Sequence, residues 1–126
     1  RKIGEEFIAD DFAHEQSVVF ETGKGLVIFN SCSHGGIVNI VREVQMALGG
    51  QKVYAVVGGF HMMKLSGMDT LAIPEEEVVE TAQELKGLGV EEIYTGHCTG
   101  NIAFRILKKE LGEMVHALGT GETVVF

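Results

Sequence analysis

The chain has 126 residues, 10 of them basic and 18 acidic, which gives a formal net charge of −8, and 45% are hydrophobic. These numbers predict one globular domain over residues 1–126, and they exclude binding to a nucleic-acid backbone because no Lys/Arg cluster offsets the negative field. No apolar run could span a bilayer and two cysteines are too few for a disulfide scaffold, so we expect a cytoplasmic protein without membrane contact.

The first half of the chain alternates extended and helical patterns. Residues 1–15 are polar and acidic and indicate a loop or a partial edge element. Residues 17–21 are rich in β-branched and aromatic side chains, a turn-forming Thr-Gly-Lys-Gly segment follows, and residues 26–29 are apolar. This pattern predicts a β-hairpin. Apolar residues then recur at helical spacing over 37–48, between two Gly-Gly pairs, which predicts a helix.

The second half continues the alternation. The predicted strands cover residues 53–57, 92–95, 114–117 and 123–126. A loop over 62–73 leads to a helix with Pro74 in its first turn, and a further helix covers 102–111. This order predicts a layered α/β fold, in which helices pack on a mixed sheet. The unbroken apolarity of 53–57 indicates burial of that strand on both faces, and whether this chain supplies both covers is left open.

Three histidines share one setting, since each lies in a Gly-rich turn directly after a predicted strand. They are His34, His61 and His97. The carboxyl ends of strands in a layered α/β sheet gather at one rim, where ligands bind, and neutral imidazole is a good ligand for zinc, manganese or iron. The pattern therefore predicts a metal site. The alternative is that each is an ordinary turn residue, and His61 could equally contact substrate or pack. His14 and His116 lack this setting and are interpreted as surface or packing residues.

Both cysteines lie beside these histidines. Cys32 is two residues before His34, and Cys98 is adjacent to His97. A structural zinc bound by these four residues is chemically conceivable. The spacings are not those of closed zinc knuckles, however, and adjacent residues seldom point at one ion. We therefore interpret each cysteine as a small thiol that lines its turn.

Thr99, Gly100 and Asn101 lie at the start of the last predicted helix. Amides exposed at a helix start can hold an anion such as a substrate phosphate, which makes these residues a candidate anion site. Thr99 also suits an ordinary N-cap, and this interpretation is favoured.

The three turns together resemble a known family. Residues 31–39 read SCSHGGIVN, residues 58–61 read GGFH and residues 96–100 read GHCTG. In this order they resemble a branch of the metallo-β-lactamase superfamily, the dihydropterin–ribofuranosylaminobenzene phosphate synthase-like metal-dependent hydrolases. The likeness runs from about residue 10 to residue 126 and implies a four-layer αββα sandwich with a metal site at the rim between its sheets.

The resemblance also implies roles for individual residues. His34 and His97 match metal-ligating histidines of the family, and His61 falls where the family has a ligand or substrate contact. Asp10, Asp11 and Glu15 resemble an acidic segment before the hairpin, to which no role is assigned. The family's His-x-His-x-Asp-His motif is absent. We therefore expect the C-terminal part of the sandwich, a partial domain without the N-terminal half, and assign no catalytic residue.

The implied function is metal-dependent hydrolysis. Two divalent ions, most simply zinc, would activate water for attack on a phosphate-containing or cyclic small-molecule substrate. The remaining ligands would come from a complementary N-terminal half or from another chain. The alternative is a non-catalytic half-domain that forms a homodimer through an exposed sheet face and binds a metal or a small anion.

Overall fold

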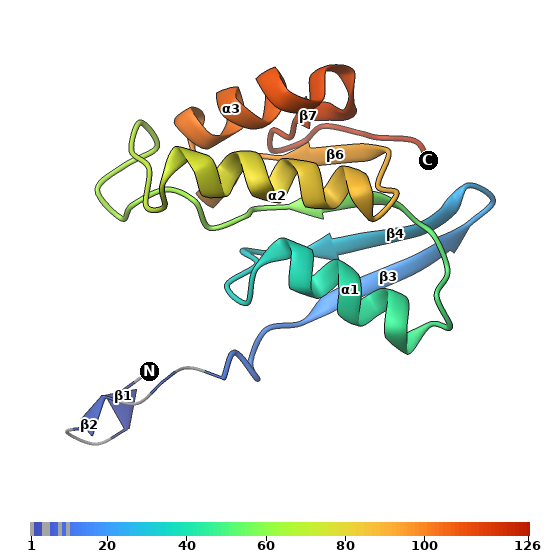
Figure 1. The fold of residues 1–126 in the computed structure, drawn as a ribbon, viewed down its shortest axis with the longest axis horizontal. Helices are drawn as coiled ribbons and strands as arrows, with labels where there is room; N and C mark the ends of the chain where they lie inside the picture. The colour runs from blue at the N-terminus through green and yellow to red at the C-terminus, as the bar shows by residue number, and fades with distance from the viewer. Residues whose placement is uncertain (1, 4–5, 8, 10) are drawn as a thin grey trace.

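The computed structural model describes residues 2–3, 6–7, 9 and 11–126, so Asp10 lies outside the described residues. Two short antiparallel strands, β1 (Lys2–Ile3) and β2 (Glu6–Phe7), precede the body of the protein. Residues 11–16 then lead into the main sheet (Figure 1). The sequence predicts a loop or a partial edge element here, and β1 and β2 pair with each other in a sheet of their own rather than with the edge of the main sheet.

The main sheet is mixed. Its strands in the described ranges follow the spatial order β3-β4-β5-β6-β7. They are β3 (Ser17–Thr22), β4 (Gly25–Asn30), β5 (Val53–Gly58), β6 (Glu92–Thr95) and β7 (Val115–Ala117). The hairpin β3–β4 is antiparallel, and every later pairing is parallel. The predicted α/β class and mixed sheet are thus confirmed.

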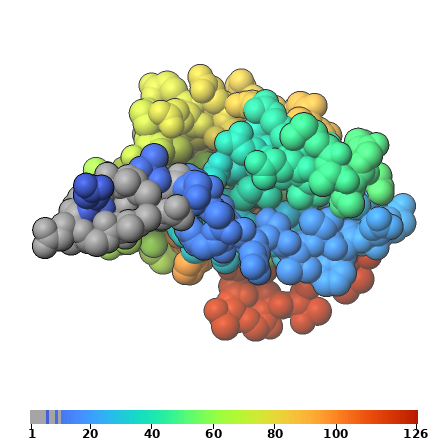
Figure 2. All heavy atoms as spheres, turned by 90° about the horizontal axis from the view of Figure 1, so that it is seen from below, coloured from blue at the N-terminus to red at the C-terminus, as the bar shows by residue number. Residues whose placement is uncertain are grey.

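All the helices among the described residues lie on one face of this sheet. They are α1 (Ile37–Ala47), α2 (Glu75–Gly87) and α3 (Asn101–Leu111). Each connects two neighbouring parallel strands and each step moves in the same direction across the sheet. Because such crossovers are right-handed, successive steps in one direction place the helices on the same side. Figure 1 shows this layer, and Figure 2 shows α1 and α2 side by side above the sheet.

The core between helices and sheet explains why these elements form. Leu26 and Ile28 of β4 and Val56 of β5 point toward the helices, whose buried stripes include Val41, Ala82 and Leu107. The stripes have the periodicity that the sequence predicts.

Helix α2 begins at Glu75, so Pro74 is its N-cap residue rather than a residue of its first turn.

The opposite face is only partly covered. Val27, Tyr54, Ala55 and Val57 form a smaller cluster there, against which Leu118 and Phe126 pack. All of residues 53–57 are buried, as predicted for that strand. At the hairpin edge, by contrast, this face is open: 56% of Val18, 57% of Phe20 and 36% of Phe29 are exposed.

The predicted strand over 123–126 is wrong. After β7 the chain turns at residues 120–121 and crosses the open face instead of pairing with the sheet edge, so the C-terminal segment lies on the side opposite the helices (Figure 2). The Phe126 ring lies edge-on to Tyr94 at 5.6 Å and to Phe29 at 6.1 Å. The Phe126 side chain thus packs against the sheet, although residues 123–126 form no strand. Among the described residues, no helix is long and apolar enough to cross a membrane.

Candidate metal centre

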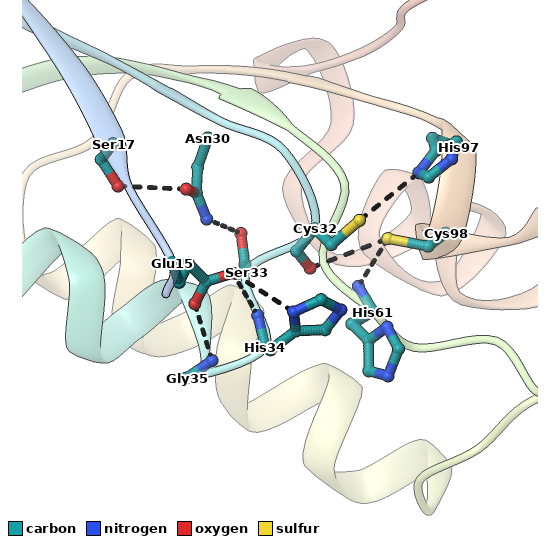
Figure 3. A network of polar contacts seen from close by, with 10 residues as sticks. All are labelled: Glu15, Ser17, Asn30, Cys32, Ser33, His34, Gly35, His61, His97 and Cys98. Carbon is teal, nitrogen blue, oxygen red and sulfur yellow. Dashed lines mark hydrogen bonds and ion pairs between the residues drawn. The ribbon is translucent and has the colours of Figure 1, made fainter. Parts of the chain in front are cut away.

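Three loops meet at the carboxyl ends of the parallel strands. One connects β4 to α1, one follows β5, and the third is the 3₁₀ turn η1 (His97–Thr99) between β6 and α3. Figure 3 shows His34, His61 and His97 on these loops. Ser33, His61 and His97 have φ angles of 56°, 52° and 49° and account for three of the four positive-φ non-glycine residues that the described ranges contain. Such strained backbone concentrates at functional sites.

His34 and His61 form what we call the histidine pair. Their ring centroids lie 4.4 Å apart in an edge-to-face arrangement. The His34 side chain is 33% exposed and His61 is exposed. The ring of His14 lies 6.0 Å from that of His34, and Phe12 stacks beside it at 6.4 Å. The sequence analysis expected His34 and His61 at one rim, and the structure brings them together.

Glu15 holds the loop that carries His34. Its carboxylate oxygens accept hydrogen bonds from the backbone N–H groups of His34 (2.6 Å) and Gly35 (2.9 Å). The same carboxylate lies 3.7 Å from Nδ1 of His34. Burial raises the pKa of the Glu15 carboxyl, but the N–H donors of Gly35 and His34 outweigh burial and leave the pKa below its usual value. No role was assigned to Glu15 from the sequence, and only its place in an acidic segment before the hairpin signalled it.

Cys32, His97 and Cys98 form a second group, which we call the thiol cluster. Each offers one ligand atom, and these atoms all lie within 4.8 Å of one another; this is the one such group of three that the described residues contain. Cys32 Sγ lies 3.9 Å from Nδ1 of His97. Cys98 is buried, and its Sγ accepts the backbone N–H of His61 at 3.3 Å (Figure 3). Burial, together with the neighbouring Cys32, raises the pKa of the Cys98 thiol to about 11.

This cluster differs from the four-residue zinc site considered in the sequence analysis. His34 does not belong to it. Although adjacent residues seldom point at one ion, the donor atoms of His97 and Cys98 lie within 4.8 Å of each other and of that of Cys32. His97 has a left-handed backbone and begins a 3₁₀ turn, so the two side chains leave the chain in directions that converge beside Cys32.

Close packing of the loops depends on Gly59. A Cβ atom at this position would lie 2.6 Å from Cys98 Sγ and 3.0 Å from the Ser31 carbonyl oxygen, both too close for an unstrained side chain. The missing side chain therefore allows the loop after β5 to lie directly against the thiol cluster.

Thr99 does not cap α3, and that prediction is wrong. Gly100 occupies the N-cap position, and among the described residues no side chain caps the helix. The buried Thr99 hydroxyl oxygen accepts the backbone N–H of Phe60 at 2.9 Å and lies 2.6 Å from that of Thr95, which donates to the Gly58 carbonyl at 2.7 Å. Since Thr95 uses its proton on Gly58, Thr99 donates to Thr95. The hydroxyl chain thus joins η1 to the loop that carries His61.

The candidate anion site at the same turn stays a prediction. The backbone N–H groups of Thr99, Gly100 and Asn101 donate to the carbonyls of Gly96, His97 and Met68 at 3.0, 3.3 and 2.7 Å. The Asn101 side chain donates to Asp69 at 2.9 Å. These donors therefore have partners within the protein.

The chain is similar to known proteins in sequence and in fold. No protein-family model matches the chain. Over 119 residues it is 38% identical to 7,8-dihydropterin-6-methyl-4-(β-D-ribofuranosyl)-aminobenzene-5'-phosphate synthase of Methanocaldococcus jannaschii, which covers 94% of this chain and 38% of that protein. It matches the crystal structure of Tm1679, a metal-dependent hydrolase of the β-lactamase superfamily, with a TM-score of 0.83 and 30% identity, over 99% of this chain and 45% of that one. In sequence this chain is similar to both proteins, and its fold is that of the β-lactamase superfamily.

These matches confirm the resemblance to the metallo-β-lactamase superfamily that the three Gly-rich turns indicate. The chain spans less than half the length of either relative. The neighbour is metal-dependent, and imidazole and thiolate are donors that bind divalent ions of intermediate softness such as zinc. The donor types at the rim therefore fit a metal of the kind that this superfamily implies.

A groove of about 410 Å³ opens beside the histidine pair. His34 and His61 line it together with Ile73 and with Arg42 of α1. Arg42 forms an ion pair with Glu84 of α2 at 2.5 Å, and Glu84 and Glu77 line the same groove. A larger hollow of about 620 Å³ lies against Glu15 and α1, but none of the histidines lines it. The smaller groove is thus the better candidate for a small molecule near the imidazoles.

His116 is a packing residue, as predicted, and lies within a strand rather than in one of the Gly-rich turns. It lies on β7, where its ring stacks on Tyr94 and contacts the Glu92 carboxylate at 2.5 Å. It therefore serves as a matched control for the histidines of the candidate site.

Proposed function

We propose that this chain contributes part of the metal centre of a metal-dependent enzyme that acts on a small molecule carrying a phosphate group. His34, His61 and His97 are the proposed ligands, with zinc as the first choice and manganese or iron as alternatives. The observation that carries the proposal is the histidine pair, because two imidazoles 4.4 Å apart extend from the carboxyl ends of neighbouring strands in a chain related to a metal-dependent hydrolase.

The surroundings of the pair support this proposal. Metal-ligating histidines usually have a carboxylate or carbonyl near the ring nitrogen that does not bind the ion. Glu15 supplies such a carboxylate, 3.7 Å from Nδ1 of His34, which leaves Nε2 for a metal. A bound divalent ion would lower the pKa of a coordinated water and polarise a phosphoryl oxygen.

The phosphate preference depends on Arg42. Arg42 lines the groove beside the histidine pair, and its guanidinium would exchange the Glu84 carboxylate for two oxygens of a phosphate, which suit its planar shape. The relative from Methanocaldococcus jannaschii is a synthase whose product name includes a 5'-phosphate. Hydrolysis and a synthase reaction are both compatible with metal activation of a phosphate-bearing substrate, so the proposal is limited to that substrate class.

The open sheet face supports a partner for this chain. Val18, Phe20 and Phe29 are exposed there, and large exposed apolar groups of this kind mark interaction surfaces. We propose that a complementary half packs on this face and completes the set of metal ligands. The alternative is a non-catalytic half-domain in which a second copy covers the same face.

Metal analysis together with a generic phosphodiester assay tests this function. We expect His34→Ala and His61→Ala each to reduce the bound zinc or manganese of the purified protein, and to reduce any metal-dependent hydrolysis of bis-p-nitrophenyl phosphate. His116→Ala is the matched control and should change neither. Metal content equal to that of the wild type in a His34→Ala/His61→Ala double variant would remove both residues from the ligand set.

The same assays, together with a measurement of the oligomeric state, separate the enzyme from the non-catalytic half-domain. Metal binding without turnover, combined with a dimer that Phe20→Ser dissociates, would favour the non-catalytic half-domain. Metal-dependent turnover that requires His34 would favour the enzyme.

A further inference from the structure

The structure assigns a second metal site, and we propose that Cys32, His97 and Cys98 bind one soft divalent ion such as zinc through two sulfurs and one nitrogen. This site shares His97 with the proposed function. The thiol site does not depend on the proposed function, because the two thiols lie outside the histidine pair and give a metal signal of their own.

Distances between the donor atoms carry the first step. With zinc–sulfur bonds of about 2.3 Å and zinc–nitrogen bonds of about 2.0 Å, a tetrahedral ion separates sulfur from nitrogen by about 3.5 Å and sulfur from sulfur by about 3.8 Å. Cys32 Sγ and His97 Nδ1 are 3.9 Å apart, and no donor atom of the cluster is more than 4.8 Å from another. Small side-chain rotations therefore suffice to place the three donors around one ion.

The composition of the cluster carries the second step. Two sulfurs and an imidazole are the donors that zinc takes in many proteins, and a site with three protein ligands keeps its fourth position open. Cys98 is buried, Cys32 is half-buried and His97 is exposed, so the cluster reaches solvent on one side. An ion can thus enter past His97, and each thiol gives its proton to the solvent as the metal binds.

The residues of the thiol cluster come from two different loops, so a bound ion would link these loops. Cys32 belongs to the loop after β4, whereas His97 and Cys98 belong to η1 after β6. Cys98 Sγ also accepts the backbone N–H of His61, which lies on the loop after β5. An ion held by the cluster would therefore cross-link two loops directly and restrain the third, which carries one member of the histidine pair.

Cobalt substitution tests the site. Cobalt(II) bound to cysteine gives an intense near-ultraviolet sulfur-to-metal charge-transfer band, which ligation by histidine alone does not give. The protein is first reduced, and a thiol titration confirms two free cysteines. We expect one equivalent of cobalt to produce the band and zinc to displace it, whereas Cys32→Ser and Cys98→Ser each abolish it. Cys32 is half-buried, so Cys32→Ser still tests the site if Cys98→Ser perturbs the fold.

The control variants separate this proposal from the proposed function. The charge-transfer band should persist in the His34→Ala/His61→Ala double variant and in His116→Ala, and His97→Ala should weaken cobalt binding. If the reduced wild-type protein shows no band while His34 and His61 still bind metal, the thiol site is excluded and the proposed function stands. If the band forms but His34→Ala and His61→Ala leave the total metal content unchanged, the thiol site stands and the proposed function is excluded.

Alkylation supplies an independent measurement. A bound ion protects thiols from iodoacetamide, so zinc should slow the labelling of Cys32 in the wild type several-fold. The same zinc concentration should leave the labelling of Cys32 unchanged in His97→Ala. Equal labelling rates with and without zinc in the wild type would contradict the proposal.

Discussion

The histidine pair and the thiol cluster lie at one rim but are held in place differently. His34 is positioned from outside the sheet, by a carboxylate on the segment before β3 that accepts two loop N–H groups. The thiol cluster is positioned from within, because Cys98 packs against Gly59 and the neighbouring Thr99 hydroxyl is buried. The first arrangement depends on charge and hydrogen bonds, and the second on close packing. Substitutions that weaken the Glu15 contacts should therefore leave the thiol cluster largely intact.

The largest effect is expected from Gly59→Ala. The new Cβ would lie 2.6 Å from Cys98 Sγ, and the opposing Ser31 carbonyl at 3.0 Å limits relief by backbone movement. Overpacking of this kind costs about 1–3 kcal/mol, and we expect the upper part of that range in the free energy of unfolding from urea denaturation. The cobalt charge-transfer band should be lost at the same time.

The control for this substitution is Gly87→Ala. Gly87 is the last residue of α2, and a Cβ there would meet nothing within 4 Å. Alanine in a helix is more stable than glycine by about 0.5–1 kcal/mol, so this variant should be at least as stable as the wild type. If Gly59→Ala unfolds at the wild-type urea concentration, close packing does not position the thiol cluster.

A smaller loss of stability is expected from Thr99→Val. The substitution keeps the shape of the side chain but removes the acceptor for the buried Phe60 N–H. An unsatisfied buried donor costs about 1–3 kcal/mol, and we expect about 2 kcal/mol because Thr95 keeps its bond to Gly58. Thr81→Val on α2 is the control, since its exposed hydroxyl bonds only to its own helix and its loss should stay within about 0.5 kcal/mol. Equal losses in the two variants would argue against a structural role for the hydroxyl chain.

Local pattern predicts most of the fold. The hairpin, the three helices and the strand over 92–95 follow from side-chain periodicity and turn residues, and each prediction is confirmed. The strand over 123–126 fails because β propensity does not reveal whether a sheet edge is available. In this chain the turn at residues 120–121 directs the segment across the sheet.

The contacts within the site are largely beyond such reasoning, because they join distant parts of the chain. Cys32 and His97 are 65 residues apart, and Phe60 and Thr99 are 39 apart. The sequence Thr-Gly-Asn suits a helix cap, yet a partner from another loop determines what the Thr99 hydroxyl does. What could be predicted was the rim itself, since three histidines each follow a strand whose carboxyl end lies there.

The smallest change in stability is expected from Glu15→Gln, which acts on the histidine pair alone. A glutamine has one acceptor oxygen, so it can satisfy either the His34 or the Gly35 N–H, while its own amide group faces the other donor. We expect a loss of about 1 kcal/mol, because one charge-assisted hydrogen bond becomes a neutral one and the other is lost in part to solvent. Glu21→Gln on the exposed side of β3 controls for the change in charge.

Metal binding by the Glu15→Gln protein then decides whether the two parts of the rim are independent. Removing a carboxylate that supports a ligating histidine lowers metal affinity by about 10- to 100-fold, and metal bound through His34 should follow this rule. The thiol cluster has no contact with Glu15 among the described hydrogen bonds, so the cobalt charge-transfer band should keep its intensity and its midpoint. A parallel loss of both signals would mean that one ion is shared across the rim, with His97 as the bridge between its two halves.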